Sequence, residues 1–194
     1  MAEVNVVTVA RTAGAHGEEI ARGIAAELGF RYIDSEIITR AAGAVGWRPE
    51  DVAKAEGRQS LIQKIMLGLA SASYGADGGV TMPVLPPDPG IEHVIVDTVK
   101  AIAAEGKAVI VAHGASVALA DRDDVLRVFV TASPGVRAER AGGEKAVRDS
   151  DKARAAFFSR FFGLHEEPLY DVILNTDSVS IESAVRAVSG LARS

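Results

Sequence analysis

Residues 9–21, VARTAGAHGEEIA, have the layout of a loop that binds phosphate. β-Branched residues precede them, small residues and glycines form the turn, and a segment typical of a helix follows. Backbone N–H groups at a helix N-terminus bind phosphate because they have no partner within the helix and lie at the positive end of its dipole. Gly14 and Gly17 allow the backbone to approach a ligand closely. The stretch therefore predicts a turn that binds a phosphorylated ligand.

The same loop departs from the common P-loop signature GxxxxGK[ST], whose lysine contacts the outer phosphates and whose hydroxyl contacts Mg²⁺. With Gly17 as the second glycine, Glu18 stands in the lysine position and Glu19 in the hydroxyl position. Either carboxylate is a candidate Mg²⁺ ligand. Arg11 and His16 flank the glycines and are candidates to return positive charge. The alternative is an ordinary strand-to-helix turn whose two acids stabilise the first helical turn.

The composition is that of a globular domain and excludes several kinds of chemistry. A chain of 194 residues with 48% hydrophobic and 24% charged residues is long enough for one domain with a substantial core. Its formal net charge of −5 argues against a nucleic acid as the main partner. The absence of cysteine excludes disulfides and thiolate sites. Without a basic and apolar leader or a long apolar run, we expect a cytoplasmic protein with no membrane partner.

Short β-branched runs alternate along the chain with stretches of helical period. Strands are predicted at residues 4–10, 30–33, 108–112, 126–131 and 171–175. Helices are predicted at about 17–28 and 180–192, where apolar residues recur every third or fourth position. Near-continuous apolar strands separated by helices indicate a parallel sheet with right-handed crossovers. The predicted fold is α/β, a three-layer α/β/α domain with a parallel sheet of about five strands.

A long insertion separates the second and third predicted strands. Residues 73–90 hold most of the prolines and are predicted to form an irregular loop, whereas the segment before them has helical period. We therefore expect a helical insert of roughly sixty residues within a single domain that spans residues 1–194.

Several further segments resemble parts of one protein family and strengthen the weak signal of the loop. DSEIITR keeps Asp34, Ser35 and Arg40 at the spacing of the Asp-Ser-Gly-x-x-x-Arg segment of bacterial cytidylate kinases. KAVRDSDKARAAFF resembles the arginine-rich lid of the same kinases. AGAHGEEIA is similar to the YGSGGREIA loop of one branch, which also lacks the lysine. LRVFVTASPGVRAER and YDVILNTDSVSIESAVRAV look like the family's last two strands with their helices. Taken together, the chain resembles the cytidylate kinase-like family of P-loop nucleoside monophosphate kinases.

The resemblance implies an acceptor site and places its residues. Residues 35–105 would form the region that binds a nucleoside monophosphate. Arg40, with Asp34 and Ser35 beside it, would hold the phosphate of that acceptor. His113 stands after the third strand where relatives commonly have an arginine, and it retains a weaker, pH-dependent donor.

The resemblance also implies a lid and a reaction. Residues 141–156 would form the lid, and Arg148, Lys152 and Arg154 would close over the donor phosphates. Phosphoryl transfer needs positioning and cations around the migrating group, which such arginines and Mg²⁺ supply. The implied activity is ATP- and Mg²⁺-dependent phosphorylation of a nucleoside monophosphate, CMP or dCMP, by a monomer or homodimer whose partners are small nucleotides.

Other interpretations remain open from the residues alone. A charged, solvated helix start with ion pairs three or four residues apart would look like the lid cluster. A protein that has lost its donor site would bind a monophosphate but not ATP, and would act as a catalytically silent regulatory protein. A kinase for another small metabolite would use residues 55–105 to reshape the acceptor pocket, and the 73–90 loop would suit a protein partner.

Overall fold

The computed structural model describes residues 3–34, 89–112, 114–166 and 168–194. Most of the predicted insert, including nearly all of the 73–90 loop, lies outside these ranges. The described strands and helices are, in chain order, β1 Val6–Arg11, α1 Gly17–Leu28, β2 Arg31–Ile33, α4 Pro89–Ala104, β3 Ala108–Val111, α5 Ala115–Ala118, β4 Val125–Thr131, α6 Pro134–Arg140, α7 Glu144–Phe162, β5 Val172–Asn175 and α8 Ile181–Ala192.

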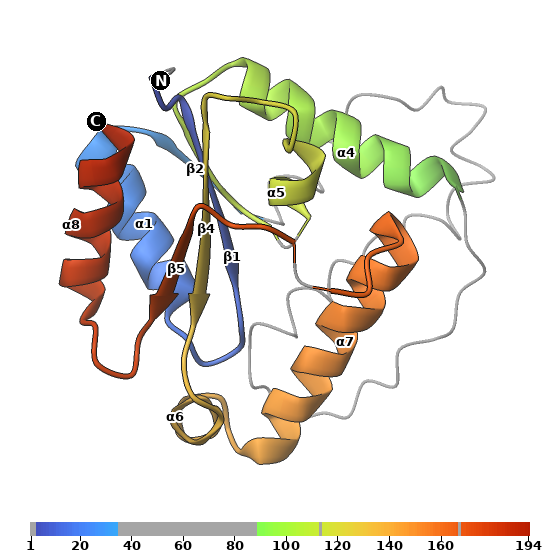
Figure 1. Ribbon diagram of the computed structural model, residues 1–194, viewed down its shortest axis with the longest axis vertical. Helices are drawn as coiled ribbons and strands as arrows, with labels where there is room; N and C mark the ends of the chain where they lie inside the picture. The colour runs from blue at the N-terminus through green and yellow to red at the C-terminus, as the bar shows by residue number, and fades with distance from the viewer. Residues whose placement is uncertain (1–2, 35–88, 113, 167) are drawn as a thin grey trace, which may run out of the picture.

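The five strands form one parallel sheet in the order β2-β3-β1-β4-β5. The predicted five-stranded parallel sheet is therefore confirmed. β1 lies at the centre, where Val9 pairs with Val111 of β3 on one side and with Val128 of β4 on the other. All strands end at the same edge of the sheet, so the glycine loop after β1 lies in the middle of that edge (Figure 1). Ligands of open α/β sheets bind at this edge.

Helices cover both faces of the sheet and complete the three layers. α1 and α8 pack on one face, and α4 and α5 pack on the other (Figure 1). Alternate residues of β1 point to opposite faces: Val7 and Val9 contact the α1–α8 side, and Val6 contacts the α4–α5 side. All six residues of β1 are buried, as expected for a central strand covered on both faces.

The ends of the helices follow local signals in the sequence. α1 begins at Gly17 as predicted and ends at Gly29, which adopts a left-handed conformation with φ of 67°. Ser180 caps α8 by accepting a hydrogen bond from the Ser183 amide. α4 begins at Pro89, so the predicted irregular loop extends two residues too far. Proline suits the first turn of a helix because the missing N–H has no partner there.

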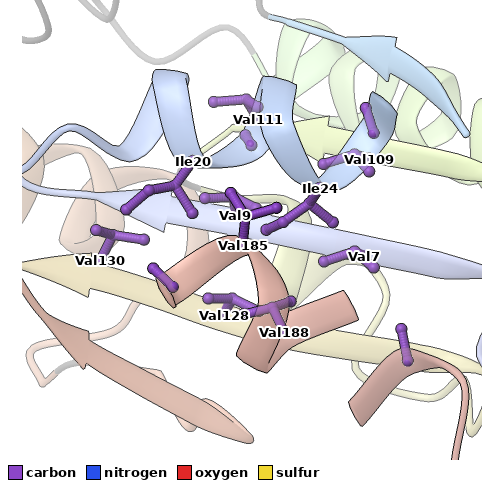
Figure 2. Close-up of a cluster of buried hydrophobic side chains, with 14 of the residues drawn as sticks. Val7, Val9, Ile20, Ile24, Val109, Val111, Val128, Val130, Val185 and Val188 are labelled. Atoms are coloured by element: carbon purple, nitrogen blue, oxygen red, sulfur yellow. The ribbon is translucent and has the colours of Figure 1, made fainter. Parts of the chain in front are cut away.

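α1 and α8 approach closely, which fixes the position of α1 and hence of the loop before it. Figure 2 shows Ile20 and Ile24 of α1 facing Val185 and Val188 of α8 over the valines of the sheet. A Cβ added at Gly23 would lie only 2.5 Å from Cγ2 of Val185. A Cβ added at Gly190, which is also helical, would meet nothing within 4 Å.

We expect Gly23→Ala and Gly190→Ala to differ in stability although both replace a helical glycine. Alanine has the higher helix propensity, so Gly190→Ala should raise the free energy of unfolding by up to about 1 kcal/mol. Gly23→Ala should lose this gain because overpacking against Val185 costs about 1–3 kcal/mol. Urea denaturation of the two variants measures the difference, and equal midpoints would contradict the close packing of α1 on α8.

Candidate functional site

The loop between β1 and α1 has a conformation that depends on glycine. Gly14 has a φ of +78°, and a Cβ there would lie 2.5 Å from the carbonyl oxygen of Arg137. His16, directly before α1, also has a positive φ of 59°. Left-handed backbone is unfavourable for a residue with a side chain and is often found at ligand-binding sites. The loop is therefore held in one specific shape.

Three consecutive carbonyl groups of the loop accept hydrogen bonds from side chains of α6 and of the segment after β5. The pairs are Arg137 Nε to Ala13 O at 2.9 Å, Arg140 Nη1 to Gly14 O at 3.4 Å, and Thr176 Oγ1 to Ala15 O at 3.2 Å. Arg140 also donates to the hydroxyl and carbonyl oxygens of Thr176, at 3.0 and 3.1 Å. The loop carbonyls are thus directed toward α6 and β5.

The backbone amides of the same loop are available to a ligand. Within the described ranges, the amides of Gly14, His16 and Gly17 donate to no backbone carbonyl. The first amides of α1 have no partner within the helix by geometry, and the helix dipole adds positive potential there. The arrangement can hold anionic oxygens, which is what the sequence predicts for this loop.

Arg137 connects the loop to α7. Its side chain is only 5% exposed, and its guanidinium donates to both carboxylate oxygens of Asp151, at 3.1 and 2.5 Å. Nearby, Val147 of α7 packs against Ala13 of the loop in a small apolar cluster. The start of the predicted lid therefore contacts the phosphate loop directly.

Glu18 in the lysine position forms an ion pair with Arg11. Nη2 of Arg11 lies 2.6 Å from Oε1 of Glu18, and the two side chains are 9% and 24% exposed. A Cβ on Gly17 would lie 2.5 Å from Cβ of Arg11, so this glycine makes room for the arginine. The negative charge of Glu18 is thus balanced within the loop by the guanidinium of Arg11.

Glu19 also has a partner in the loop, because its Oε1 lies 3.1 Å from Nδ1 of His16. Burial of Glu19 raises its pKa, but the hydrogen bond with His16 and the charges of His16 and Arg11 outweigh this and leave the pKa below its ordinary value. Glu19 is therefore ionised at neutral pH. No group of three or more potential metal ligands occurs among the described residues, so Mg²⁺ would rely on this carboxylate and on phosphate oxygens.

The predicted lid cations lie on α7 in different environments. Arg148 is exposed and pairs with Glu144 at 3.0 Å, and Lys145 pairs with Asp149 at 2.5 Å, both one turn away. The hydrogen bond from Lys145 is the main reason that the pKa of Asp149 lies below its ordinary value. Lys152 is exposed on the same helix. These are the ion pairs of a solvated helix, and the role of Arg148 and Lys152 in transfer stays a prediction.

Arg154, the third predicted lid cation, is buried instead, with 6% of its surface exposed. It donates to Oη of Tyr170 at 3.0 Å and lies over the rings of Phe129 and Phe158, at 4.8 and 4.9 Å. It therefore joins α7 to β4 and to the segment before β5. Its role in transfer stays a prediction.

The C-terminal end of α7 contacts the loop that follows β3. A Cβ on Gly114 would lie 2.7 Å from the ring of Phe162 and 3.5 Å from that of Phe157. α7 continues to Phe162, beyond the predicted end of the lid at residue 156. The helix thus extends from the phosphate loop to the residue next to His113.

Most predicted acceptor residues cannot be placed. Ser35, Arg40 and His113 lie outside the described ranges, and Asp34 directly follows β2 at the ligand-binding edge of the sheet. The neighbouring Tyr32 was not predicted to belong to the site. Burial is the main reason that the pKa of its hydroxyl is raised, with smaller contributions from Glu18 and Asp34, while Arg22 and Arg11 oppose the shift.

Comparison with known sequences identifies the family. The family described as cytidylate kinase-like matches residues 6–178, most of the chain. The chain belongs to the cytidylate kinase-like family. A cytidylate kinase from Azorhizobium caulinodans is 31% identical over 134 residues, 67% of this chain and 64% of that relative. The match therefore spans less than two thirds of the relative's own length.

Solved structures agree with this family in their fold. An uncharacterized protein from Eubacterium ventriosum has a TM-score of 0.66 at 17% identity, with 98% of each chain covered. A shikimate kinase from Acinetobacter baumannii, in complex with shikimate, has a TM-score of 0.52 at 12% identity, with 97% of this chain and 92% of that chain covered. The three-layer P-loop kinase fold predicted from the sequence is confirmed. Of the described helices, none combines the length and the apolar character needed to cross a bilayer.

Three residues that bind the loop carbonyls were not predicted to belong to the site of this kinase-like fold. These are Arg137, Arg140 and Thr176. The two arginines are three residues apart in VRAER, a spacing that puts them on one face of α6. That spacing is the only signal in the sequence, since it does not reveal that the face turns toward the loop after β1.

We expect Arg137→Met to destabilise the protein far more than Arg148→Met, although both variants remove one guanidinium from an ion pair. Arg137→Met leaves the Ala13 carbonyl and Asp151 without their donor, which should cost about 2–4 kcal/mol. Arg148→Met removes an exposed pair one helical turn apart and should change stability by less than about 0.5 kcal/mol. Thermal and urea unfolding at neutral pH measure both, and similar losses would contradict the assigned role of Arg137.

Proposed function

We propose that this protein transfers the γ-phosphoryl group of ATP to a nucleoside monophosphate, with CMP or dCMP as the acceptor. One observation carries the proposal: side chains of α6 and Thr176 bind three carbonyls of the glycine loop, while the amides of Gly14, His16 and Gly17 donate to no backbone carbonyl. A loop that had lost its ligand would not need its backbone held in this orientation. Family membership supports the choice of acceptor.

The described residues fit a polyphosphate donor despite the altered signature. Loop amides and the start of α1 would hold the phosphate oxygens. The Arg11–Glu18 pair adds no net charge to the loop, so Glu18 does not cancel the positive potential of the amides and the helix dipole. Ionised Glu19 is the candidate ligand for Mg²⁺ at the edge of the same site. When bound, ATP with Mg²⁺ would supply the phosphoryl group to an acceptor phosphate oxygen, leaving ADP.

The chain's own residues would bind the two substrates, orient them toward each other and exclude water from the site. β1 places the donor loop beside the end of β3, and β2 places Asp34 on the far side of β3. An acceptor held by Asp34, Ser35, Arg40 and His113 would lie on this side of the donor phosphates. α7 borders the donor loop through Val147 and would present Arg148 and Lys152 to the closed site.

A titration with ATP, Mg²⁺ and CMP, followed by calorimetry and by ADP release, tests the proposal. Steady ADP formation that depends on CMP is the expected result. Binding of CMP without binding or turnover of ATP would instead identify a protein that senses a nucleotide. Turnover only with another acceptor in a panel of phosphorylated and hydroxylated metabolites would reject CMP and keep the kinase.

Gly14→Ala should abolish this activity, whereas Gly29→Ala should keep it. Both glycines have a positive φ, +78° at Gly14 and +67° at Gly29, so both alanines are strained by about 1 kcal/mol. Only Gly14→Ala also forces a Cβ against the Arg137 carbonyl and displaces the loop. Calorimetric titration with ATP measures the difference; comparable ATP affinity in the two variants would show that the loop does not hold the donor.

A further inference from the structure

Phosphoryl transfer needs a cation where this loop carries an acid, and the structure limits which side chain supplies it. Among the described residues around the loop, Arg137 and Arg140 donate to loop carbonyls from behind. Arg154 is buried between two aromatic rings. Arg11 differs because its guanidinium reaches the first turn of α1, where the loop amides are available.

Two features of the sequence allow the Arg11 side chain to reach this position. Arg11 is the last residue of the central strand β1, and its side chain is almost fully buried. The absence of a side chain at Gly17 lets its stem pass the start of the helix: a Cβ there would lie 2.5 Å from Cβ and 2.9 Å from Cδ of Arg11. Gly17 thus serves the placement of an arginine as well as the approach of a ligand.

Glu18 holds the guanidinium group at the end of the Arg11 side chain. Its Oε1 accepts from Nη2 of Arg11 at 2.6 Å, in a pair that is mostly shielded from water. A guanidinium has five N–H donors in a planar fork, so it can contact a carboxylate and phosphate oxygens together. The ion pair with Glu18 holds this planar donor group at the first turn of α1, next to the position where the usual loop carries its lysine.

We propose that Arg11 is the donor-phosphate cation of this protein, replacing the lysine of the usual loop, and that Glu18 is the residue that positions it. This inference rests on the proposed function. It also gives Glu18 a role other than that of a Mg²⁺ ligand, because its carboxylate is paired with Arg11.

Four full-length variants test the inference: Arg11→Met, Arg11→Lys, Glu18→Gln and the double variant Arg11→Met/Glu18→Gln. Arg11→Met should lower kcat/KM for ATP by about 100-fold or more, as expected when a direct contact to a developing charge is lost. Arg11→Lys should recover part of kcat because it keeps the charge. Glu18→Gln should lower kcat by a smaller factor, because the amide oxygen still accepts from Arg11.

The double variant separates a direct role from a merely compensating one. If Arg11 only neutralises Glu18, removing both should restore wild-type turnover, and that result would overturn the proposal. If Arg11 contacts the donor, the double variant should remain at least about ten-fold below wild type. Urea unfolding of the double variant checks that it is folded at the assay temperature, so that lost turnover is not caused by misfolding.

Binding of inorganic tripolyphosphate, measured by calorimetry without any acceptor, distinguishes failure of this inference from failure of the proposed function. Tripolyphosphate bound by wild type and lost in Arg11→Met and in the double variant supports the role of Arg11, even if CMP is never phosphorylated. Wild-type turnover of CMP with unchanged tripolyphosphate affinity in Arg11→Met would keep the kinase and reject the role of Arg11. No tripolyphosphate binding by wild type would reject both.

Discussion

The fixed direction of three loop carbonyls is the constraint on which the rest of the site depends. A peptide group that turns its carbonyl one way must turn its amide the other way, so holding the carbonyls of Ala13, Gly14 and Ala15 from behind sets where the amides point. The groups that hold them come from α6 and from Thr176 after β5. The donor site is therefore built by segments more than a hundred residues apart in the chain, brought together by the order of the sheet.

Each acid of the loop has a partner close by. Glu18 pairs with Arg11, and Glu19 contacts Nδ1 of His16, so two acids in the first turn of α1 coexist with loop amides that donate to no backbone carbonyl. Their carboxylates also interact favourably with the helix dipole. A loop without the usual lysine is thus compatible with phosphate binding as long as each acid has its partner. The replacement of the usual lysine and hydroxyl residue by two glutamates would by itself suggest that the loop does not bind phosphate.

Much of the fold could be predicted from the sequence because its signals are local. The bounds of α1, the cap at Ser180 and the buried valines of β1 each follow from neighbouring residues, and all agree with the structure. The partners of the loop could not be predicted, because the contact of Arg137 with Ala13 depends on strand order and on the exact position of α6. Arg154 shows the same limit: a charged residue in a basic segment is expected at the surface, yet two aromatic rings and Tyr170 surround it.

α7 relates the two halves of the site physically. In its first half, Asp151 pairs with Arg137, which binds the glycine loop; at its end, the ring of Phe162 lies against Gly114, next in sequence to the predicted acceptor residue His113. A continuous helix of 19 residues transmits a displacement at one end to the other, since its backbone hydrogen bonds resist bending. A displacement of the glycine loop would therefore reach the loop that follows β3, because one continuous helix contacts both.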